Sequence, residues 1–368
     1  MENQKIGFIG LGLIGGSLAK TIRRKHPEIT IIATDIDVKA LSDAKEEGTI
    51  NDAYPTFGPA FYDVSYLFLC APIRANLEVV SDIKDHLPQE SDCIITDVGS
   101  MKRNIHEEIR FLGMDNRFIG GHPMAGLETI GYEHANAYLF ENVYYIITPE
   151  PAVPPERVKQ FRAFLESIDV VPIALAVEEH DFATACVSHV PHIISAALVN
   201  LVKNNDTSDQ VLRSIAAGGF KDITRISSSS PDMWTQISHG NKNEVLPVLD
   251  QYIASLQAVR DQICKDEKKC VYNFFSSAKE YRDSISNRTG GAILQSYELF
   301  CDIADEEGEI ATIATRLATH HINIKNIGIV HNREFEHGVL NIEFYTAQAL
   351  QEAVNLLHKF HYQIYERN

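Results

Sequence analysis

Short apolar runs alternate with amphipathic stretches along the first half of the chain. The runs are almost continuously apolar, as in 67–69 and 94–95, which is typical of parallel strands covered on both faces. Alternation with helical stretches at this spacing predicts a doubly wound, Rossmann-type parallel sheet. The expected strands lie at 6–9, 30–34, 66–70, 93–97, 118–121, 143–148 and 170–173. One helix is expected directly after the first strand, three more near 39–47, 76–87 and 102–112, and a last one after Pro155.

The pattern changes after residue 177 to helices without intervening strands. Apolar residues recur at helical spacing from 193 to 201 and again from 246 to 259. We therefore expect an all-α second domain. Long apolar stripes of this kind favour packing against a second copy as well as against the first domain, so the sequence predicts a homodimer formed through the helices.

A third pattern begins near the C-terminus. Residues 286–295 are small and polar with paired glycines, which is typical of a linker. The elements expected after it follow the order βαββαβ of a ferredoxin-like sandwich. We predict a sheet domain at 1–176, a helical substrate and dimerisation domain at 177–285, the linker at 286–295 and the sandwich at 296–368.

Composition narrows the class of partner and the compartment. The net charge of -17 argues against nucleic acid or an anionic membrane, because both favour clustered Lys and Arg. Six cysteines are scattered without CxxC pairs, which fits reduced thiols rather than a disulfide framework or a zinc site. We expect no apolar run of membrane-spanning length and no secretory leader, and hence a cytoplasmic protein.

The first strand runs into a turn with the spacing GxGxxG, formed by Gly10, Gly12 and Gly15. The first glycine permits the tight turn, the second lets backbone approach a pyrophosphate, and the third lets the helix pack on the strand. Asp35 ends the second strand twenty residues after Gly15, where a ribose-binding acid belongs, and it would repel a 2′-phosphate. The motif therefore predicts NAD rather than NADP, against the alternative of a turn made of glycines for steric reasons alone. Leu13 and Ile14, which open the helix, and Ala71 and Pro72, which follow the third strand, complete the expected cofactor site.

Two polar residues follow neighbouring strand ends, where ligands bind in open α/β sheets. His122 lies among Gly120, Gly121 and Gly126, which suggests close approach of a ligand. A histidine beside a nicotinamide is a natural general base, because hydride loss from a carbinol requires removal of the hydroxyl proton. Ser100 is placed to hydrogen-bond His122 or the substrate hydroxyl. The alternatives are a loop histidine that only bonds backbone, and a serine that caps the following helix.

The helical domain carries two further polar clusters. Ser188, His189 and His192 lie at the start of a long helix, or at a proline kink in it, and they are expected to donate to an anionic substrate rather than to bind metal. Asp222 and Arg225 stand at i,i+3. They either pair with each other on the surface, for under about 1 kcal/mol, or present the Arg225 guanidinium to a substrate carboxylate.

These strings together resemble prephenate dehydrogenase. The resemblance rests on GLGLIGGS, TDVGSMK (96–102), GGHPMAGLE (120–128), SHVPH (188–192), FKDITRI (220–226) and PDMW (231–234), and it covers residues 5 to 285. It implies NAD-dependent oxidative decarboxylation of prephenate to 4-hydroxyphenylpyruvate in tyrosine biosynthesis. The tail resembles an ACT domain, an amino-acid-sensing module.

The family resemblance also implies a role for each residue. His122 is similar to the histidine that polarises the ring hydroxyl, Ser100 to the serine that orients it, and Arg225 to the arginine that anchors a carboxylate. The remaining substrate-binding candidates are His192, which faces the substrate's side chain, with Ser188 and His189 beside it, the gate-like Glu128, and Asp222 and Trp234 as supports of the arginine region.

For the tail, the likeness implies feedback inhibition by tyrosine, with the effector expected near 305–308 and 323–326, against a module that only dimerises. Three alternatives to the assigned reaction stay open. Arogenate dehydrogenase differs in the substrate side chain, and residues around His192 and Glu128 would discriminate. A β-hydroxyacid dehydrogenase normally uses a lysine that the SHVPH segment lacks. A non-catalytic sensor of NAD and an amino acid would leave His122, Ser100 and Arg225 unexplained.

Overall fold

The computed structural model describes residues 4–87, 91–126, 129–286, 297–303, 306–330 and 338–366. The chain divides into two compact units, Met1–Gly291 and Ala292–Asn368. All but the first residue of the predicted linker 286–295 lie outside the described residues. The linker therefore stays a prediction, as do the proposed domain boundaries.

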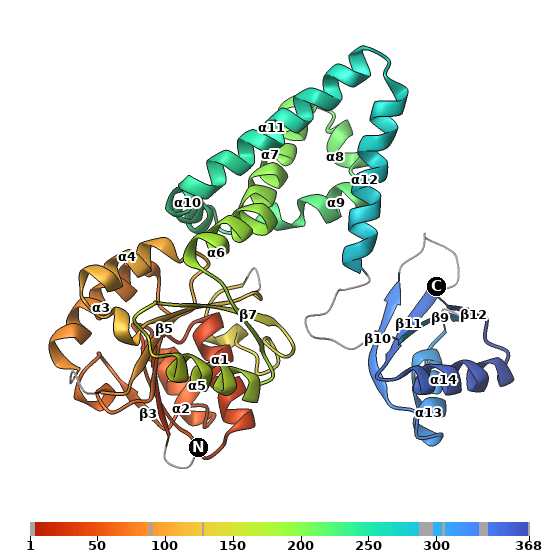
Figure 1. Cartoon of the computed structure of the whole chain (residues 1–368). Helices are drawn as coiled ribbons and strands as arrows, with labels where there is room; N and C mark the ends of the chain where they lie inside the picture. The colour runs from red at the N-terminus through yellow and green to blue at the C-terminus, as the bar shows by residue number, and fades with distance from the viewer. Residues whose placement is uncertain are drawn as a thin grey trace. The chain divides into compact units, whose positions relative to one another are not determined.

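A five-stranded parallel sheet in the order β3-β2-β1-β4-β5 forms the centre of the first unit, as the alternating pattern predicts (Figure 1). The sequence prediction did not include β3, because it has only three residues and none of them is fully buried. A run that short gives no period to recognise. The strands are β1 (Lys5–Ile9), β2 (Thr30–Thr34), β3 (Asp52–Tyr54), β4 (Tyr66–Leu69) and β5 (Ile94–Asp97).

A second sheet extends the first beyond β5. Strand β6 (Ile119–Pro123) lies next to β5, and a parallel bridge joins Ile95 to Phe118. Strand β7 (Tyr144–Pro149) runs antiparallel to β6, and β8 (Val171–Ala174) runs parallel to β7. The direction reverses because the connection from β6 to β7 contains no crossover helix.

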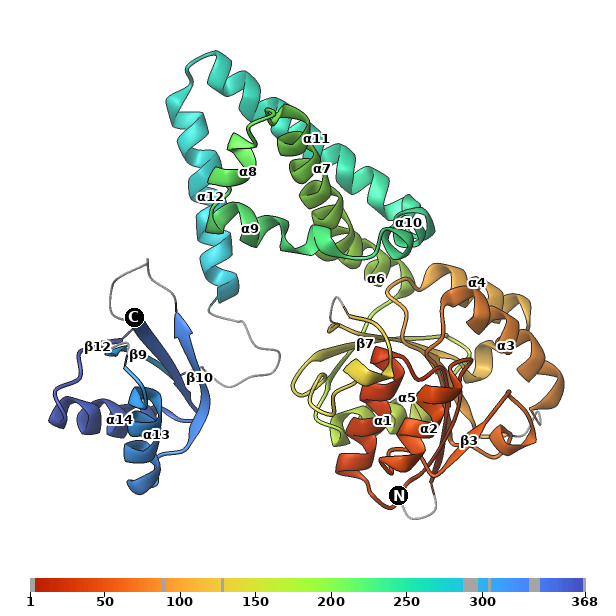
Figure 2. The same ribbon diagram turned by 180° about the vertical axis from the view of Figure 1, so that it is seen from behind.

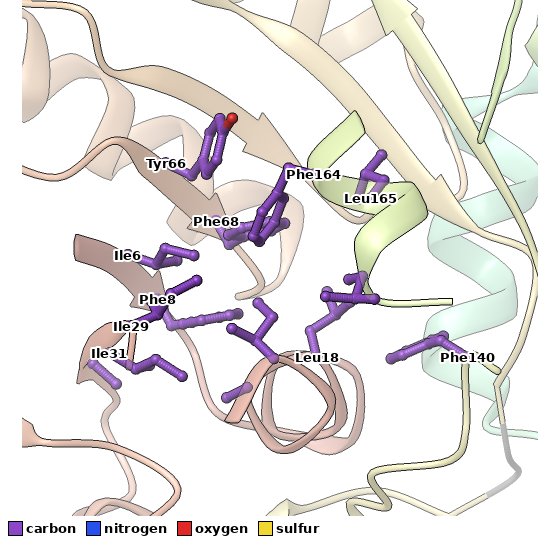
Figure 3. Packing of buried hydrophobic residues seen from close by; sticks show 14 of the residues in the cluster. Ile6, Phe8, Leu18, Ile29, Ile31, Tyr66, Phe68, Phe140, Phe164 and Leu165 are labelled. Atoms are coloured by element: carbon purple, nitrogen blue, oxygen red, sulfur yellow. The ribbon is translucent and has the colours of Figure 1, made fainter. Parts of the chain in front are cut away.

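Helices cover both faces of the central sheet. Helices α1 (Leu13–Lys25), α2 (Val38–Glu46) and α5 (Pro155–Ser167) pack on one face, and α3 (Ile73–His86) and α4 (Arg103–Phe111) on the other. On the first face the Phe8 and Phe68 rings stack at 5.0 Å, with Phe164 of α5 close by (Figure 3). Double coverage explains the continuous apolar strands. Helix α3 begins three residues before the predicted start, directly after Pro72, which is its N-cap and makes no side-chain capping bond.

The helical part begins with one long rod. Helix α6 (Val177–Thr184), a π-helical turn (Ala185–His189) and α7 (Val190–Asn205) join into a continuous helix of 29 residues. Pro191 does not break the rod, because the π-helical turn lies just before it, where the missing N–H of a proline interrupts the regular hydrogen-bond ladder. The expectation that no segment reaches membrane-spanning length was therefore wrong: of the described helices, this one is long and apolar enough to do so.

Most of the remaining helices pack on that rod, and the last one packs on the helix before it. Helices α8 (Val211–Ile215) and α9 (Gly218–Thr224) lie between α7 and α12 (Lys268–Ser286), while α10 (Pro231–Gly240) leads into the 23-residue α11 (Lys242–Cys264) (Figures 1 and 2). Their sequences place much apolar surface on the outside. Leu246, Ile253 and Leu256 of α11 are all exposed in the single chain.

The C-terminal unit has the predicted βαββαβ order and an antiparallel sheet in the order β10-β11-β9-β12. Alternate residues of β9 and β11 face the two helices and form a separate core, while their neighbours face away. The elements are β9 (Tyr297–Ile303), α13 (Glu309–Thr319), β10 (Ile324–Val330), β11 (Gly338–Phe344), α14 (Ala347–Lys359) and β12 (Ile364–Glu366).

Candidate active site

The glycine turn has three different steric environments. A Cβ on Gly10 would lie 2.8 Å from the backbone of Ala71, and its φ of +100° favours glycine. A Cβ on Gly15 would lie 2.3 Å from the Gly10 carbonyl oxygen. A Cβ on Gly12 would meet nothing within 4 Å. Packing therefore requires the first and third glycines, whereas the second borders open space.

That open space lies at the N-terminus of α1. Gly12 is the N-cap, no side chain caps the helix, and its first turn holds no acid. The N–H groups at the helix start, where Leu13 and Ile14 lie, thus remain available to an anion. Asp35 directly follows β2 beside the turn, and its carboxylate accepts a 2.5 Å hydrogen bond from the Leu11 N–H. These features fit a dinucleotide whose pyrophosphate lies against Gly12.

The loop after β4 forms the other wall of this region. Asn76, a buried residue of α3, donates to the carbonyls of Leu69 and Ala71 and accepts from the Ala71 N–H. Ala71 and Pro72, both predicted to contact the cofactor, are thus held by one amide side chain. Nothing in the sequence identified Asn76, because a single polar residue in an amphipathic helix carries no signal of its own.

His122 belongs to a chain of hydrogen bonds. Its Nδ1 lies 2.8 Å from Nε2 of His180, and His180 Nδ1 lies 2.8 Å from Oδ1 of Asp181. A carboxylate only accepts, so the His180 Nδ1–H donates to Asp181, and His180 Nε2 accepts from the His122 Nδ1–H. The arrangement leaves the Nε2 lone pair of His122 available to receive a proton. Sequence analysis missed His180 and Asp181, whose only signal is the dipeptide His-Asp at a helix start.

Burial and neighbouring charges act on the same chain. Burial lowers the pKa of His122 well below the ordinary histidine value, and the proximity of His180, Lys102 and His189 adds to the effect. For Asp181, burial opposes ionisation, but hydrogen bonds from His180 and from two backbone N–H groups outweigh it and lower the pKa. The site therefore holds an ionised Asp181 and a neutral His122.

Ser100 does not cap α4, so the capping alternative was wrong. The helix begins at Arg103, and the N–H groups of Lys102 and Arg103 donate to the carboxylate of Asp181 at 2.9 and 3.0 Å. Ser100 lies before this point, half-buried in the loop that follows β5. Because a carboxylate from α6 caps α4, the Ser100 hydroxyl is not needed for that task.

Gly120 and Gly121 have a packing cause, whereas Gly126, the third glycine from which ligand approach is expected, borders open space. A Cβ on Gly120 would lie 2.3 Å from Thr148 Oγ1, and one on Gly121 would lie 2.5 Å from the carbonyl oxygen of Asp97. Strand β6 therefore runs unusually close to its neighbours. Buried Lys102 donates to Asp97 Oδ2 at 2.5 Å and to the Gly121 carbonyl at 2.7 Å, which joins β5 to β6.

His189 and Trp234 contribute buried N–H groups near the other histidines. His189 Nδ1 lies 3.0 Å from the Asn241 amide nitrogen, which assigns the proton to Nε2. Neither His189 Nε2 nor Trp234 Nε1 has a hydrogen-bond partner among the described residues. Burial lowers the pKa of His189 to about 4, so its ring is neutral. The His192 ring stacks on Trp234 at 3.5 Å, and its Nδ1 donates to the carbonyl of Ser188.

Arg225 lies in the short helix that follows α9, beside α7. Ser195 of α7 bonds the carbonyl of Ile223 and the hydroxyl of Ser227, so the segment on both sides of Arg225 is fixed to the helix that carries His192. Both Asp222 and Arg225 are exposed in the single chain. Glu128 lies outside the described residues. Within the part of the chain that the structure describes, no three His, Cys, Asp or Glu side chains gather to hold a metal.

In the C-terminal unit, the residues expected near the effector lie at two places. Gly308 is the left-handed N-cap of α13, with φ of +91°. Asn323 is exposed just before β10, and Asn326 on that strand donates to Glu343 of β11. Asp305 lies outside the described residues.

Two family models match the first unit. "Prephenate dehydrogenase, nucleotide-binding domain" matches residues 18–174, and "Prephenate dehydrogenase, dimerization domain" matches 176–279. A prephenate dehydrogenase of Bacillus subtilis is 36% identical over 336 residues, 91% of this chain and 90% of that protein. The prephenate dehydrogenase of Aquifex aeolicus, solved with hydroxyphenyl propionate and NAD+, has a TM-score of 0.72 and 29% identity over 77% of this chain and 99% of its own. Synechocystis arogenate dehydrogenase has a TM-score of 0.69 and 30% identity over 77% of this chain and 100% of its own.

The steric difference between two glycines yields a prediction. Gly12→Ala should leave the melting temperature nearly unchanged, because its Cβ enters open space, but should weaken NAD binding by obstructing the pyrophosphate. Gly15→Ala should lower the melting temperature, because its Cβ would overlap the Gly10 carbonyl. Calorimetric titration with NAD and thermal denaturation measure both effects. Unchanged NAD affinity in Gly12→Ala would contradict the assigned pyrophosphate position.

Proposed function

The chain belongs to the prephenate dehydrogenase family, and we propose that His122 is the base of its reaction, held in place by His180 and Asp181. The protein is an NAD-dependent prephenate dehydrogenase of tyrosine biosynthesis. The observation that carries the proposal is the hydrogen-bond chain from Asp181 through His180 to His122, which leaves His122 Nε2 as a neutral acceptor.

Prephenate carries a carboxylate and, across its ring, a carbinol. Gly10–Gly15 and Asp35 would hold NAD, which would supply the acceptor for the hydride that leaves the carbinol carbon. His122 Nε2 accepts the hydroxyl proton as that hydride departs. His180 keeps the His122 ring in the required tautomer, and Asp181 stabilises the positive charge that develops on the two rings. Loss of the ring carboxylate as CO2 then gives the aromatic product.

Residues of the helical part are proposed to bind the carboxylates of the substrate. Arg225 presents a guanidinium for one carboxylate. His192 of α7, with Ser188 and His189 of the π-turn beside it, faces the substrate's side chain. Ser100 is proposed to orient the ring hydroxyl toward His122. The remaining proposed contacts are Glu128 as a gate, and Asp222 and Trp234 as supports, with Trp234 acting through its stacking on His192.

We propose a homodimer formed through 177–285. The match to a dimerization domain supports it, as does the exposed apolar surface of α7 and α11. Only 22% of the most apolar stretch of helix Val177–Asn205 is buried within one chain. The same helix carries His180 and Asp181. We therefore propose that a partner subunit, rather than lipid, covers its apolar surface. The protein is a soluble metabolic enzyme, and we place it in the cytoplasm.

The C-terminal unit is proposed to be an ACT domain that binds tyrosine and inhibits the enzyme. Its βαββαβ order and sheet order support the likeness. The proposed effector site comprises the 305–308 loop and the 323–326 segment. It is separate from the catalytic residues, all of which belong to the first unit.

The base assignment is tested by turnover. His122→Asn should reduce kcat with prephenate by about 10²–10⁴, the range for general acid–base groups, with NAD affinity nearly unchanged. The base acts only when neutral, so wild-type kcat should fall as the pH drops through the His122 pKa, below the ordinary value of about 6.5. NADH absorbance between pH 5 and 9 measures both. Unchanged turnover would remove His122 from the mechanism, and turnover with arogenate alone would overturn the substrate assignment.

The carboxylate anchor is tested by substrate affinity. Arg225→Ala should raise the KM for prephenate about 10- to 100-fold, the loss expected of a charge-assisted hydrogen bond worth about 1.5–3 kcal/mol. Lys221→Ala, which removes an exposed cation from the neighbouring helix α9, is the matched control and should leave KM within about twofold. Equal KM values in both variants would favour the alternative in which Arg225 only pairs with Asp222 on the surface.

Tyrosine resembles the product of the reaction, so it has two candidate binding places, the C-terminal unit and the active site. Tyrosine bound at the C-terminal unit should inhibit the full chain even at saturating prephenate, and Asn323→Ala should weaken that inhibition without changing kcat. Asn205→Ala, another exposed asparagine, is the control. Inhibition that is strictly competitive with prephenate and unchanged in Asn323→Ala would place tyrosine in the active site instead.

A further inference from the structure

We propose that Lys102 is a positioning residue of the reaction, which fixes His122 and the Ser100 loop in one geometry through Asp97 and the carbonyl of Gly121. The inference rests on the proposed role of His122 and goes beyond it, because Lys102 is assigned no contact with substrate or cofactor. Its effect is exerted through two backbone segments.

The ion pair closes the loop that carries Ser100. Asp97 is the last residue of β5, and Lys102 is the N-cap of α4. The 2.5 Å bond from Lys102 Nζ to Asp97 Oδ2 joins the two ends of this loop, and the Gly99 N–H also donates to Asp97 Oδ2 at 2.9 Å. Ser100 lies between the two joined residues. Its position is thereby tied to the end of the central sheet.

The same pair holds the residue before His122 on both sides. The Gly121 N–H donates to Asp97 Oδ1 at 3.1 Å, and the Gly121 carbonyl accepts from Lys102 Nζ at 2.7 Å. Both backbone polar groups of Gly121, which belong to the two peptide groups on either side of its Cα, are thus bound by one ion pair. Since His122 is the next residue, the direction of its side chain depends on these two bonds.

Stability alone does not account for a fully buried charge pair at this point. The side chains of Lys102 and Asp97 are 0% and 4% exposed. Burial lowers the pKa of Lys102, which shows the cost of taking the charge out of water, while Asp97 opposes the shift. Apolar replacement of a buried ion pair is often neutral or stabilising. An apolar replacement here would lose the hydrogen bonds that fix the Ser100 loop and the backbone of Gly121.

The charge of Lys102 gives a second test of the proposal, through its effect on the pKa of His122. The titratable groups that face His122 are His180 of α6, His189 of the π-turn and Lys102 before α4, with Asp97 and Asp181 behind them. A positive charge at Lys102 disfavours protonation of His122. Removal of that charge should therefore raise the pKa of His122 and move the acid limb of the kcat profile toward neutral pH.

Two variants of the full-length enzyme separate geometry from charge. Lys102→Met should lower kcat about 10- to 100-fold, as expected when a reacting group is misplaced by about 1 Å, and should shift the acid limb upward. The charge-neutral double variant Asp97→Asn/Lys102→Met should lower kcat similarly but leave the limb closer to its wild-type position. KM for prephenate and NAD affinity should stay within about threefold in both, since neither residue binds a ligand. If Lys102→Met fails to fold, the double variant carries the test.

Lys5→Met is the matched control. Lys5 Nζ donates to a carboxylate, Asp63, and to a backbone carbonyl, Ala60, both at 2.7 Å, as Lys102 does, but it lies at the opposite end of the sheet. It should lose some thermal stability and keep the wild-type kcat and acid limb. If Lys102→Met and the double variant behave like Lys5→Met, the role of Lys102 is structural and the proposal is wrong. Wild-type turnover with prephenate tests the proposed function separately.

Discussion

One residue, Asp181, joins the three parts of the catalytic region. Its carboxylate accepts hydrogen bonds from the N–H groups of Lys102 and Arg103 at the start of α4 and from His180, and its backbone carbonyl accepts from Asn241 at the start of α11. Any rotation of α6 would uncap α4, separate His180 from His122 and detach Asn241 together. These bonds therefore restrict movement between the nucleotide-binding sheet and the helical part, although the chain passes from one to the other only once.

Local signals were enough to predict most of the fold. A strand, a turn of spaced glycines and a helix are each defined within a few residues, so β1, the turn and α1 follow directly from the sequence, as does the antiparallel sandwich of the C-terminal unit. The reversal of β7 and the short β3 were not predictable in the same way. Strand direction depends on what connects two strands, and a three-residue strand is held by its neighbour rather than by its own pattern.

The candidate site shows the same division. Gly10, Gly12, His122 and Ser100 lie at or just past strand ends, and Gly15 lies in the first turn of the helix that follows, so their places can be read from a sequence. His180, Asp181 and Asn241 are more than fifty residues from His122, and each looks ordinary in its own helix. Only packing brings them into one network. The same limit explains why Gly120 and Gly121 suggested a ligand, whereas the structure shows that β6 needs them to lie against Thr148 and Asp97.

The π-turn between α6 and α7 gives this network its register. One helical residue corresponds to a rotation of about 100°, and a turn of i→i+5 hydrogen bonds absorbs one residue more than a regular turn. From a single rod, His180 can therefore face His122 while Asp181 and His189 share Asn241. Because the helix continues on both sides, it offers no loop in which a length change could be accommodated. Insertion or deletion of one residue between 182 and 188 would turn every side chain of α7 away from its neighbours, so this stretch should tolerate substitution far better than any change in length.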